Sequence, residues 1–103
     1  MYFHITADSV ELVDPQDVKA FSAVCPLDLA DEDLVTTVQR AGLGELLPRG
    51  EHLMISVEAI RRLVGDRVRP SWSQDLAKMI DYATSKGWAS TDGSRIRAHI
   101  ERR

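Results

Sequence analysis

Cysteine and long hydrophobic runs are scarce in this sequence of 103 residues. The one cysteine, Cys25, has no second cysteine with which to form an internal disulfide, and sparse cysteine is typical of the reducing cytoplasm. The sequence has no run of about 18 apolar residues and no basic and apolar leader, so we expect neither a membrane span nor a secretory signal. A cytoplasmic location is therefore the expectation.

Sequence motifs for catalysis, metal binding and nucleotide binding are also absent. His4, His52 and His99 stand at none of the spacings from one another, or from Cys25, that metal sites use. The acidic stretch 28–33 has neither the alternating ligands nor the central glycine of a calcium-binding EF-hand loop. We therefore predict no metal site, no cofactor and no catalytic residue, and we favour a protein that is not an enzyme.

Charge is divided unevenly along a chain whose length suits one small domain, residues 1–103. Residues 1–50 contain nine acidic and three basic side chains, whereas residues 51–103 contain seven acidic and ten basic ones. The net charge of −3 argues against nucleic acid as a partner, because non-specific binding to DNA or RNA depends on neutralising phosphates.

Short strands are expected near the N-terminus. Residues 2–6 are rich in β-prone side chains, and residues 10–13 fit the second strand of a hairpin. Residues 18–25 fit either a strand or a helix: Asp14 and Pro15 are typical of a helix start, whereas a short run rich in valine and phenylalanine suits a strand. We favour the strand.

The middle of the chain shows clearer start and stop signals. The pattern predicts a helix at 31–41, a loop at 43–50, a strand at 52–55 and a helix at 57–64. Asp28 or Asp31 is expected to cap the first helix, and Ser56 the second. Gly42 and Gly65 supply the residues that end them.

A longer amphipathic helix is predicted at 72–86. Ser71 and Gln74 have the spacing of a capping box, and Gly87 suits the position after the helix end. Apolar side chains recur at helical spacing on one face: Trp72, Leu76, Met79, Ile80 and Ala83. This face is expected to be buried.

A β-hairpin is predicted at 88–101, turning at Asp92-Gly93 through a type I′ turn. Its second strand alternates between an apolar side, with Ile96, Ala98 and Ile100, and a polar side, with Arg95, Arg97, His99 and Glu101. Counting back from the turn pairs Ala89 with Ile96 and Trp88 with Arg97. This register places Trp88 on the polar side.

The polar side of this hairpin is the candidate binding surface, formed by Trp88, Arg95, Arg97 and His99. An aromatic ring, guanidinium groups and an imidazole together suit an acidic peptide, a carboxylate or a phosphate. The structural alternative is a solvated strand face on which Arg97 stacks on Trp88. Combined with the predicted elements, the pattern indicates an α+β fold, a two-layer sandwich of a mainly antiparallel sheet of 4–5 strands covered on one face by three helices.

One resemblance rests on a scattered set of residues. They are Trp72, Met79, Tyr82-Ala83, Lys86-Gly87-Trp88, Asp92-Gly93 and Ala98-His99-Ile100-Glu101. This pattern is similar to the C-terminus of a group of short, uncharacterised actinobacterial proteins. The similarity extends back to the helix at 31–41 and leaves out residues 1–15. It implies no activity, and it supports the strand at 18–25.

Three functions are compatible with these observations. The leading hypothesis is a non-enzymatic protein-interaction domain that binds another protein or a second copy of itself through the hairpin face or an edge strand. Because a helix followed by Lys86-Gly87-Trp88 and a hairpin resembles a winged helix, a DNA-binding protein is the first alternative. The second is a small enzyme centred on His99 with a carboxylate supplied across a subunit boundary.

Overall fold

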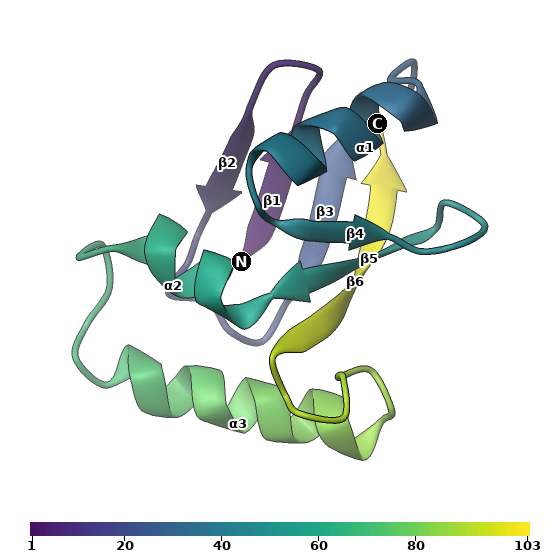
Figure 1. Cartoon of the computed structure of the whole chain (residues 1–103). Helices are drawn as coiled ribbons and strands as arrows, with labels where there is room; N and C mark the ends of the chain where they lie inside the picture. The colour runs from purple at the N-terminus through teal and green to yellow at the C-terminus, as the bar shows by residue number, and fades with distance from the viewer.

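The computed structural model describes residues 1–103 and shows an α+β fold with three helices and one six-stranded sheet (Figure 1). The elements in chain order are β1 (Tyr2–Ile5), β2 (Val10–Val13), β3 (Ser22–Cys25), α1 (Asp31–Arg40), β4 (Gly44–Leu46), β5 (His52–Ser56), α2 (Val57–Val64), α3 (Trp72–Ser85) and β6 (Arg95–Arg102). The α+β class with three helices is therefore confirmed.

The sheet differs from the predicted one in size and in strand direction. Its order is β2-β1-β3-β6-β5-β4, with antiparallel pairs at β1–β2, β4–β5 and β5–β6. The prediction of 4–5 mainly antiparallel strands is wrong in part, because there are six strands and β3 pairs in parallel with both β1 and β6. Parallel neighbours require long crossover connections. No local sequence pattern reveals which distant strand such a connection returns to.

Strand β4 was expected to be a loop. Residues 44–46 instead pair with β5, with Gly44 opposite Ile55 and Leu46 opposite Leu53. The backbone of Gly44 has φ +154°, and a Cβ atom there would lie 1.8 Å from the carbonyl oxygen of Met54. Only glycine permits this close approach. A strand of three residues that contains glycine has too little pattern to be recognised from the sequence.

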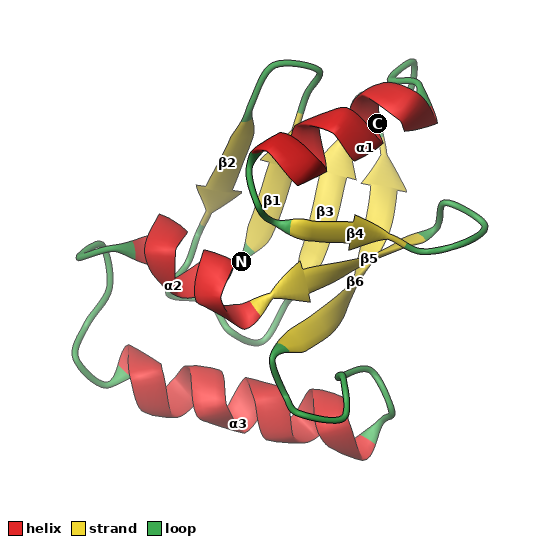
Figure 2. Ribbon diagram, in the orientation of Figure 1, coloured by secondary structure: helices red, strands yellow, loops and turns green.

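The helices are arranged around a strongly curled sheet, in which β4 and β5 cross in front of β3 and β6 (Figure 2). Helices α1 and α2 cover one face, and their buried residues join those of the sheet in one cluster. On β6, Ile96, Ala98 and Ile100 are buried, whereas Arg95 and His99 are exposed. The predicted alternation of this strand is thus confirmed.

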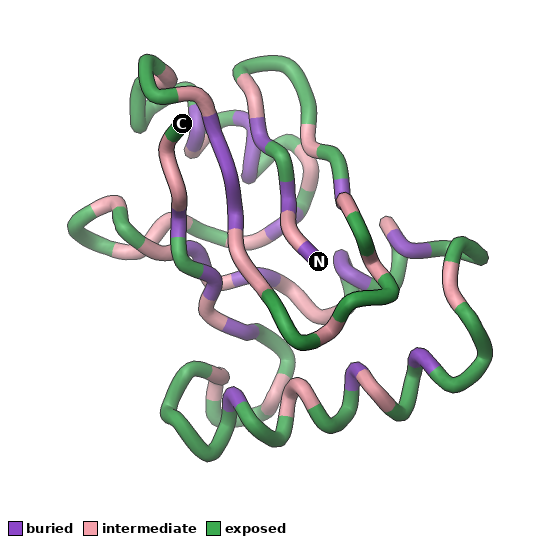
Figure 3. The backbone as a smooth tube through the Cα atoms, turned by 180° about the vertical axis from the view of Figure 1, so that it is seen from behind, coloured by how far each residue is buried: buried purple, intermediate pink, exposed green.

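Helix α3 crosses the end of the sheet near the start of β6, and its buried residues recur on the side turned toward the sheet (Figure 3). Trp72, Leu76 and Ala83 are buried, and Met79 and Ile80 are half-buried. The indole nitrogen of Trp72 donates a hydrogen bond of 2.7 Å to the carbonyl oxygen of Pro15. The predicted apolar face is therefore confirmed, and Trp72 ties the helix start to the β2–β3 connection.

The capping predictions had mixed outcomes. Ser56 caps α2 as expected, accepting a hydrogen bond of 3.2 Å from the Ala59 amide. The prediction of a capping box at Ser71 is wrong, because the backbone of Ser71 is already helical and the Ser71 side chain accepts no capping hydrogen bond. Helix α1 begins after Ala30, again without a side-chain cap, so neither Asp28 nor Asp31 caps it. At α3 the Trp72 amide donates to the Arg69 carbonyl instead, and at α1 the Asp33 and Leu34 amides donate to the Ala30 carbonyl.

The N-terminal predictions are largely confirmed. Strands β1 and β2 form the expected antiparallel pair, with Phe3 opposite Leu12. The strand predicted at 18–25 forms only over its second half, as β3, and residues 18–21 are a connection that leads into it. Phe21 in this connection packs edge-on against Phe3, with ring centroids 5.9 Å apart. This contact anchors residues 18–21 beside the sheet.

Candidate binding groove

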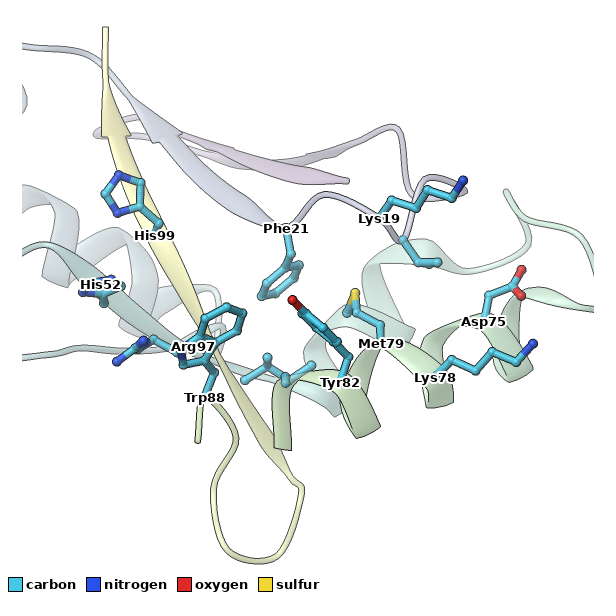
Figure 4. Close-up of a pocket in the computed structure, with 13 residues that line it drawn as sticks. Lys19, Phe21, His52, Asp75, Lys78, Met79, Tyr82, Trp88, Arg97 and His99 are labelled. Atoms are coloured by element: carbon cyan, nitrogen blue, oxygen red, sulfur yellow. The ribbon is translucent and has the colours of Figure 1, made fainter. Parts of the chain in front are cut away.

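A groove of about 700 Å³ lies between α3, residues 18–21 and the face of the sheet opposite α1 and α2 (Figure 4). We call it the α3 groove. Phe21 and Lys19 line it from the connection before β3, and Met79 and Tyr82 line it from α3. The sheet contributes His52 from β5, Arg97 and His99 from β6, and Trp88 lies at the foot of the strand.

Two backbone hydrogen bonds position Trp88. Gly87 has φ +76°, which reverses the chain after α3 and lets the Trp88 amide donate to the Ala83 carbonyl at 2.8 Å. The Trp88 carbonyl then accepts from the Arg97 amide at 2.7 Å, and Ala89 forms a bridge with Ile96. The predicted register is confirmed, although the first side of the hairpin is a single bridge rather than a strand.

The turn of this hairpin differs from the prediction. A type I′ turn needs positive φ at both Asp92 and Gly93, and only Gly93 has it, at +72°. The Asp92 carboxylate instead accepts three hydrogen bonds, from the Ser90 hydroxyl at 2.9 Å and from the Ser94 hydroxyl and amide at 2.7 and 3.0 Å. These bonds lower the pKa of Asp92 to about 2. Asp92 thus closes the turn through its side chain.

The apolar lining of the groove is partly open to solvent. Tyr82 is 58% exposed and Trp88 is 37% exposed, and their rings meet edge to face with centroids 6.0 Å apart. Phe21 and Met79 are half-buried beside them. Adjacent exposed aromatic rings are uncommon on the surface of a soluble protein unless a ligand or a partner covers them.

The predicted cationic residues separate into two places. The Arg97 guanidinium lies 5.7 Å from the centre of the Trp88 ring and makes no side-chain hydrogen bond or ion pair. Arg95 does not line the groove, because its side chain pairs with Glu45 on β4 at 3.2 Å. The structure therefore brings Trp88, Arg97 and His99 together and separates Arg95 from them.

A pair of histidines at the sheet end of the groove was not foreseen from the sequence. His52 lies directly opposite His99 in the β5–β6 pair, and their ring centroids are 5.5 Å apart. Burial lowers the pKa of His52, and the nearby Arg97 and His99 lower it further, against a smaller opposing effect of Glu51. The missing signal was long-range: both strands were predicted, but their pairing was not.

The side chains that line the groove are mainly apolar or cationic. No carboxylate hydrogen-bonds to the His99 ring, and nowhere in the chain do three or more His, Cys, Asp or Glu side chains gather closely enough to hold a metal ion. The groove offers aromatic surface together with cations that have no acidic partner. It can therefore hold a ligand that is both apolar and negatively charged.

None of the helices combines the length and the apolar character that crossing a membrane requires; the longest, α3, has 14 residues. Comparison with models of protein families, with curated proteins and with solved structures finds no match to this chain.

Proposed function

We propose that this chain is a non-enzymatic protein-interaction domain whose α3 groove binds a segment of a partner protein. The segment carries apolar side chains that cover Trp88 and Tyr82, and negative charge that faces Arg97. The observation that supports this most directly is the position of the Arg97 guanidinium, which lies beside an exposed indole and has no acidic partner.

The aromatic residues supply the expected binding energy. Tryptophan and tyrosine are enriched at protein interfaces, and a few such residues in a well-packed pocket account for most of the affinity. Trp88 and Tyr82 are already held in contact with each other. Little side-chain entropy is then lost when a partner packs against them.

The charge of the lining favours an acidic segment. Lys19, Lys78 and Arg97 line the groove without an ion pair, and Asp75 is the one acidic residue among the lining side chains. The net charge of the chain is −3, so the groove is a positive region on a negative molecule. Such local complementarity steers an acidic partner to this surface and excludes a basic one.

A second copy of the chain is the competing occupant, and an edge strand is the competing surface. The free edge of β2 is partly occupied, because an Arg67 guanidinium nitrogen donates a hydrogen bond of 3.2 Å to the Leu12 carbonyl. This contact works against pairing with another strand. The groove is therefore favoured over the β2 edge as the interaction surface.

No observation favours the other two functions. Strand β6 pairs with β3 on one side and β5 on the other, so it lies inside the sheet and does not project as the wing of a winged helix would. His99 faces a histidine rather than a carboxylate. An acid–base site would need a group that this arrangement does not supply.

Selection from a library of random short peptides on the purified protein tests the proposal. We expect enriched peptides to combine aromatic or aliphatic residues with Asp or Glu. Their binding should weaken about tenfold or more in Trp88→Ala and Arg97→Glu. It should be unchanged in Leu27→Ala and Arg61→Glu, matched controls at exposed positions outside the groove.

Two results would count against the proposal. Thermal unfolding of each variant first separates lost binding from lost folding. Peptides that bind the groove variants as well as the native chain would then exclude the groove as the site. Light scattering that shows a dimer, converted to monomer by Arg97→Glu, would identify a second copy rather than another protein as the occupant.

A further inference from the structure

We propose that His52, Arg97 and His99 form an oxyanion subsite at the sheet end of the α3 groove. It receives a carboxylate or phosphoryl group of the bound segment, and it binds more tightly as the histidines become protonated. The subsite deepens the proposed function and depends on it for the identity of the ligand. Its chemistry can nevertheless be tested with a simple anion alone.

The sheet register brings the three side chains together. His52 on β5 is directly opposite His99 on β6, and side chains in such cross-strand positions lie on the same face. Arg97 is two residues before His99 on the same strand, so it shares that face. Figure 4 shows all three beside one another at one end of the groove, with Trp88 next to Arg97.

The donors of this cluster are unoccupied. None of the three side chains makes a hydrogen bond within the protein, whereas Arg95, Arg102 and Arg103 all engage carboxylates. A guanidinium and two imidazoles can together direct several N–H groups at one anion. Since Arg97 is half-buried and lies on an indole, it is held in place rather than extended into solvent.

An anion fits this cluster better than a metal ion. Two imidazoles without a third protein ligand hold a transition metal weakly, and no third ligand is nearby. The permanent charge of Arg97 also repels a cation at this position. The same charge attracts an oxyanion, and an oxyanion bound between the rings would favour their protonated forms.

The charged surroundings determine the direction of the pH dependence. The charged groups nearest the histidine pair are Arg97 and Glu101 on β6 and Glu51 before β5. Lys19 before β3, and Asp75 and Lys78 on α3, line the opposite end of the groove (Figure 4). Glu101 is paired with Arg103 at 2.7 Å, which weakens its effect. Without ligand, burial and Arg97 keep the pKa of His52 low. A bound oxyanion opposes this, so binding takes up protons and strengthens as the pH falls.

Titration with inorganic sulfate, followed by NMR of the histidine rings, tests the subsite, because sulfate keeps its charge across the histidine range. We expect sulfate to shift the ring signals of His52 and His99 and to raise the pKa of His52. Its affinity should fall about tenfold between pH of about 5.5 and about 8. Arg97→Gln and His52→Gln should each weaken sulfate binding, and His4→Gln, at an exposed histidine outside the groove, should not.

Several outcomes would overturn the subsite. They are an absence of sulfate-induced shifts at His52 and His99, equal shifts at His4, or an affinity independent of pH. Zinc binding that requires both His52 and His99 and is stronger than sulfate binding would show that the site holds a metal ion and not an anion. The His→Gln and Arg→Gln changes remove the positive charge but keep a side-chain N–H donor. Circular dichroism checks that the variants fold.

Peptides from the groove selection separate this proposal from the proposed function. Three versions of one bound peptide, carrying Glu, Gln or phosphoserine at the same place, distinguish a carboxylate from a phosphoryl group. We expect the Gln version to bind about tenfold more weakly and to lose its pH dependence. Peptide binding that is lost in Trp88→Ala but unchanged in His52→Gln would overturn the proposed subsite and leave the proposed function standing. Sulfate binding at the histidines without any peptide binding would overturn the function alone.

Discussion

Replacing Gly44 by alanine tests the part of the fold that the sequence pattern did not reveal. The backbone at Gly44 has φ +154°, and an added Cβ would lie 1.8 Å from the Met54 carbonyl oxygen. That atom belongs to the backbone of β5, so it cannot rotate away as a side chain would. Gly65 offers a matched comparison, because its φ is also positive, +56°, and nothing lies within 4 Å of an added Cβ.

The two substitutions share one cost and differ in another. An alanine in either conformation costs on the order of 1–3 kcal/mol of backbone strain. At Gly44 the contact with Met54 also forces β4 away from β5. Losing about two strand hydrogen bonds, at about 1 kcal/mol each, adds roughly 2 kcal/mol. We therefore expect Gly44→Ala to lower the free energy of unfolding by about 2 kcal/mol more than Gly65→Ala.

Urea denaturation followed by circular dichroism measures both values in one experiment. Amide hydrogen exchange adds a local readout. The Ser56 amide donates to the Leu43 carbonyl, and the Met54 amide lies on the same side of β5, so both should lose protection in Gly44→Ala if β4 separates from β5. Equal costs for the two variants, or unchanged exchange in β5, would show that residues 44–46 do not pair with β5. That result would refute the six-stranded sheet.

Three other predictions concern stability. Leu76→Ala removes a fully buried side chain of α3 and should cost about 2–5 kcal/mol in urea denaturation, whereas Tyr82→Ala, at an exposed position, should cost less than about 1 kcal/mol. His52 has a pKa below its ordinary 6.5 in the folded state, so the unfolded state binds more protons and stability falls as the pH falls below about 6.5. His52→Gln should remove this component of a stability profile recorded near neutral pH. The pKa of Asp92 is lowered from 3.8 to about 2, so its stabilising effect is complete above 3.8 and is lost as the pH falls through about 2; Asp92→Asn should flatten acid unfolding in that range.

Local features of the fold could be predicted from the sequence because they depend on neighbours in the chain. The bounds of α1 and α3, the cap at Ser56 and the alternation in β6 follow from residue spacing and from the conformations that glycine and serine allow. The alternating pattern of β6 suggested a hairpin at the end of the chain. The structure shows an interior strand with the same pattern, because one of its faces borders the α3 groove.

Features that depend on distant pairing could not be predicted in the same way. The parallel placement of β3 beside β6 and the meeting of His52 with His99 both require the sheet order, which no short window of sequence contains. For this reason, only part of the candidate site could be identified from the sequence. Trp88, Arg97 and His99 were identified from one hairpin, but His52 and the α3 side of the groove come from elsewhere in the chain.

The α3 groove and the hydrophobic core both depend on two sequence patterns: the alternation of residues along β6 and the helical spacing of residues along α3. On β6, Arg97 and His99 alternate with buried Ile96 and Ala98, and this alternation places Arg97 and His99 in the groove. On α3, burial of Leu76 and Ala83 turns Tyr82 to the edge of the contact, where it meets Trp88. A shift of one residue in β6 would move its charged side chains into the core and its apolar ones into the groove. The packing that stabilises the fold therefore also holds the proposed binding surface in one arrangement before a partner binds. This preorganisation lowers the entropy cost of binding, so that a few exposed residues are enough for useful affinity.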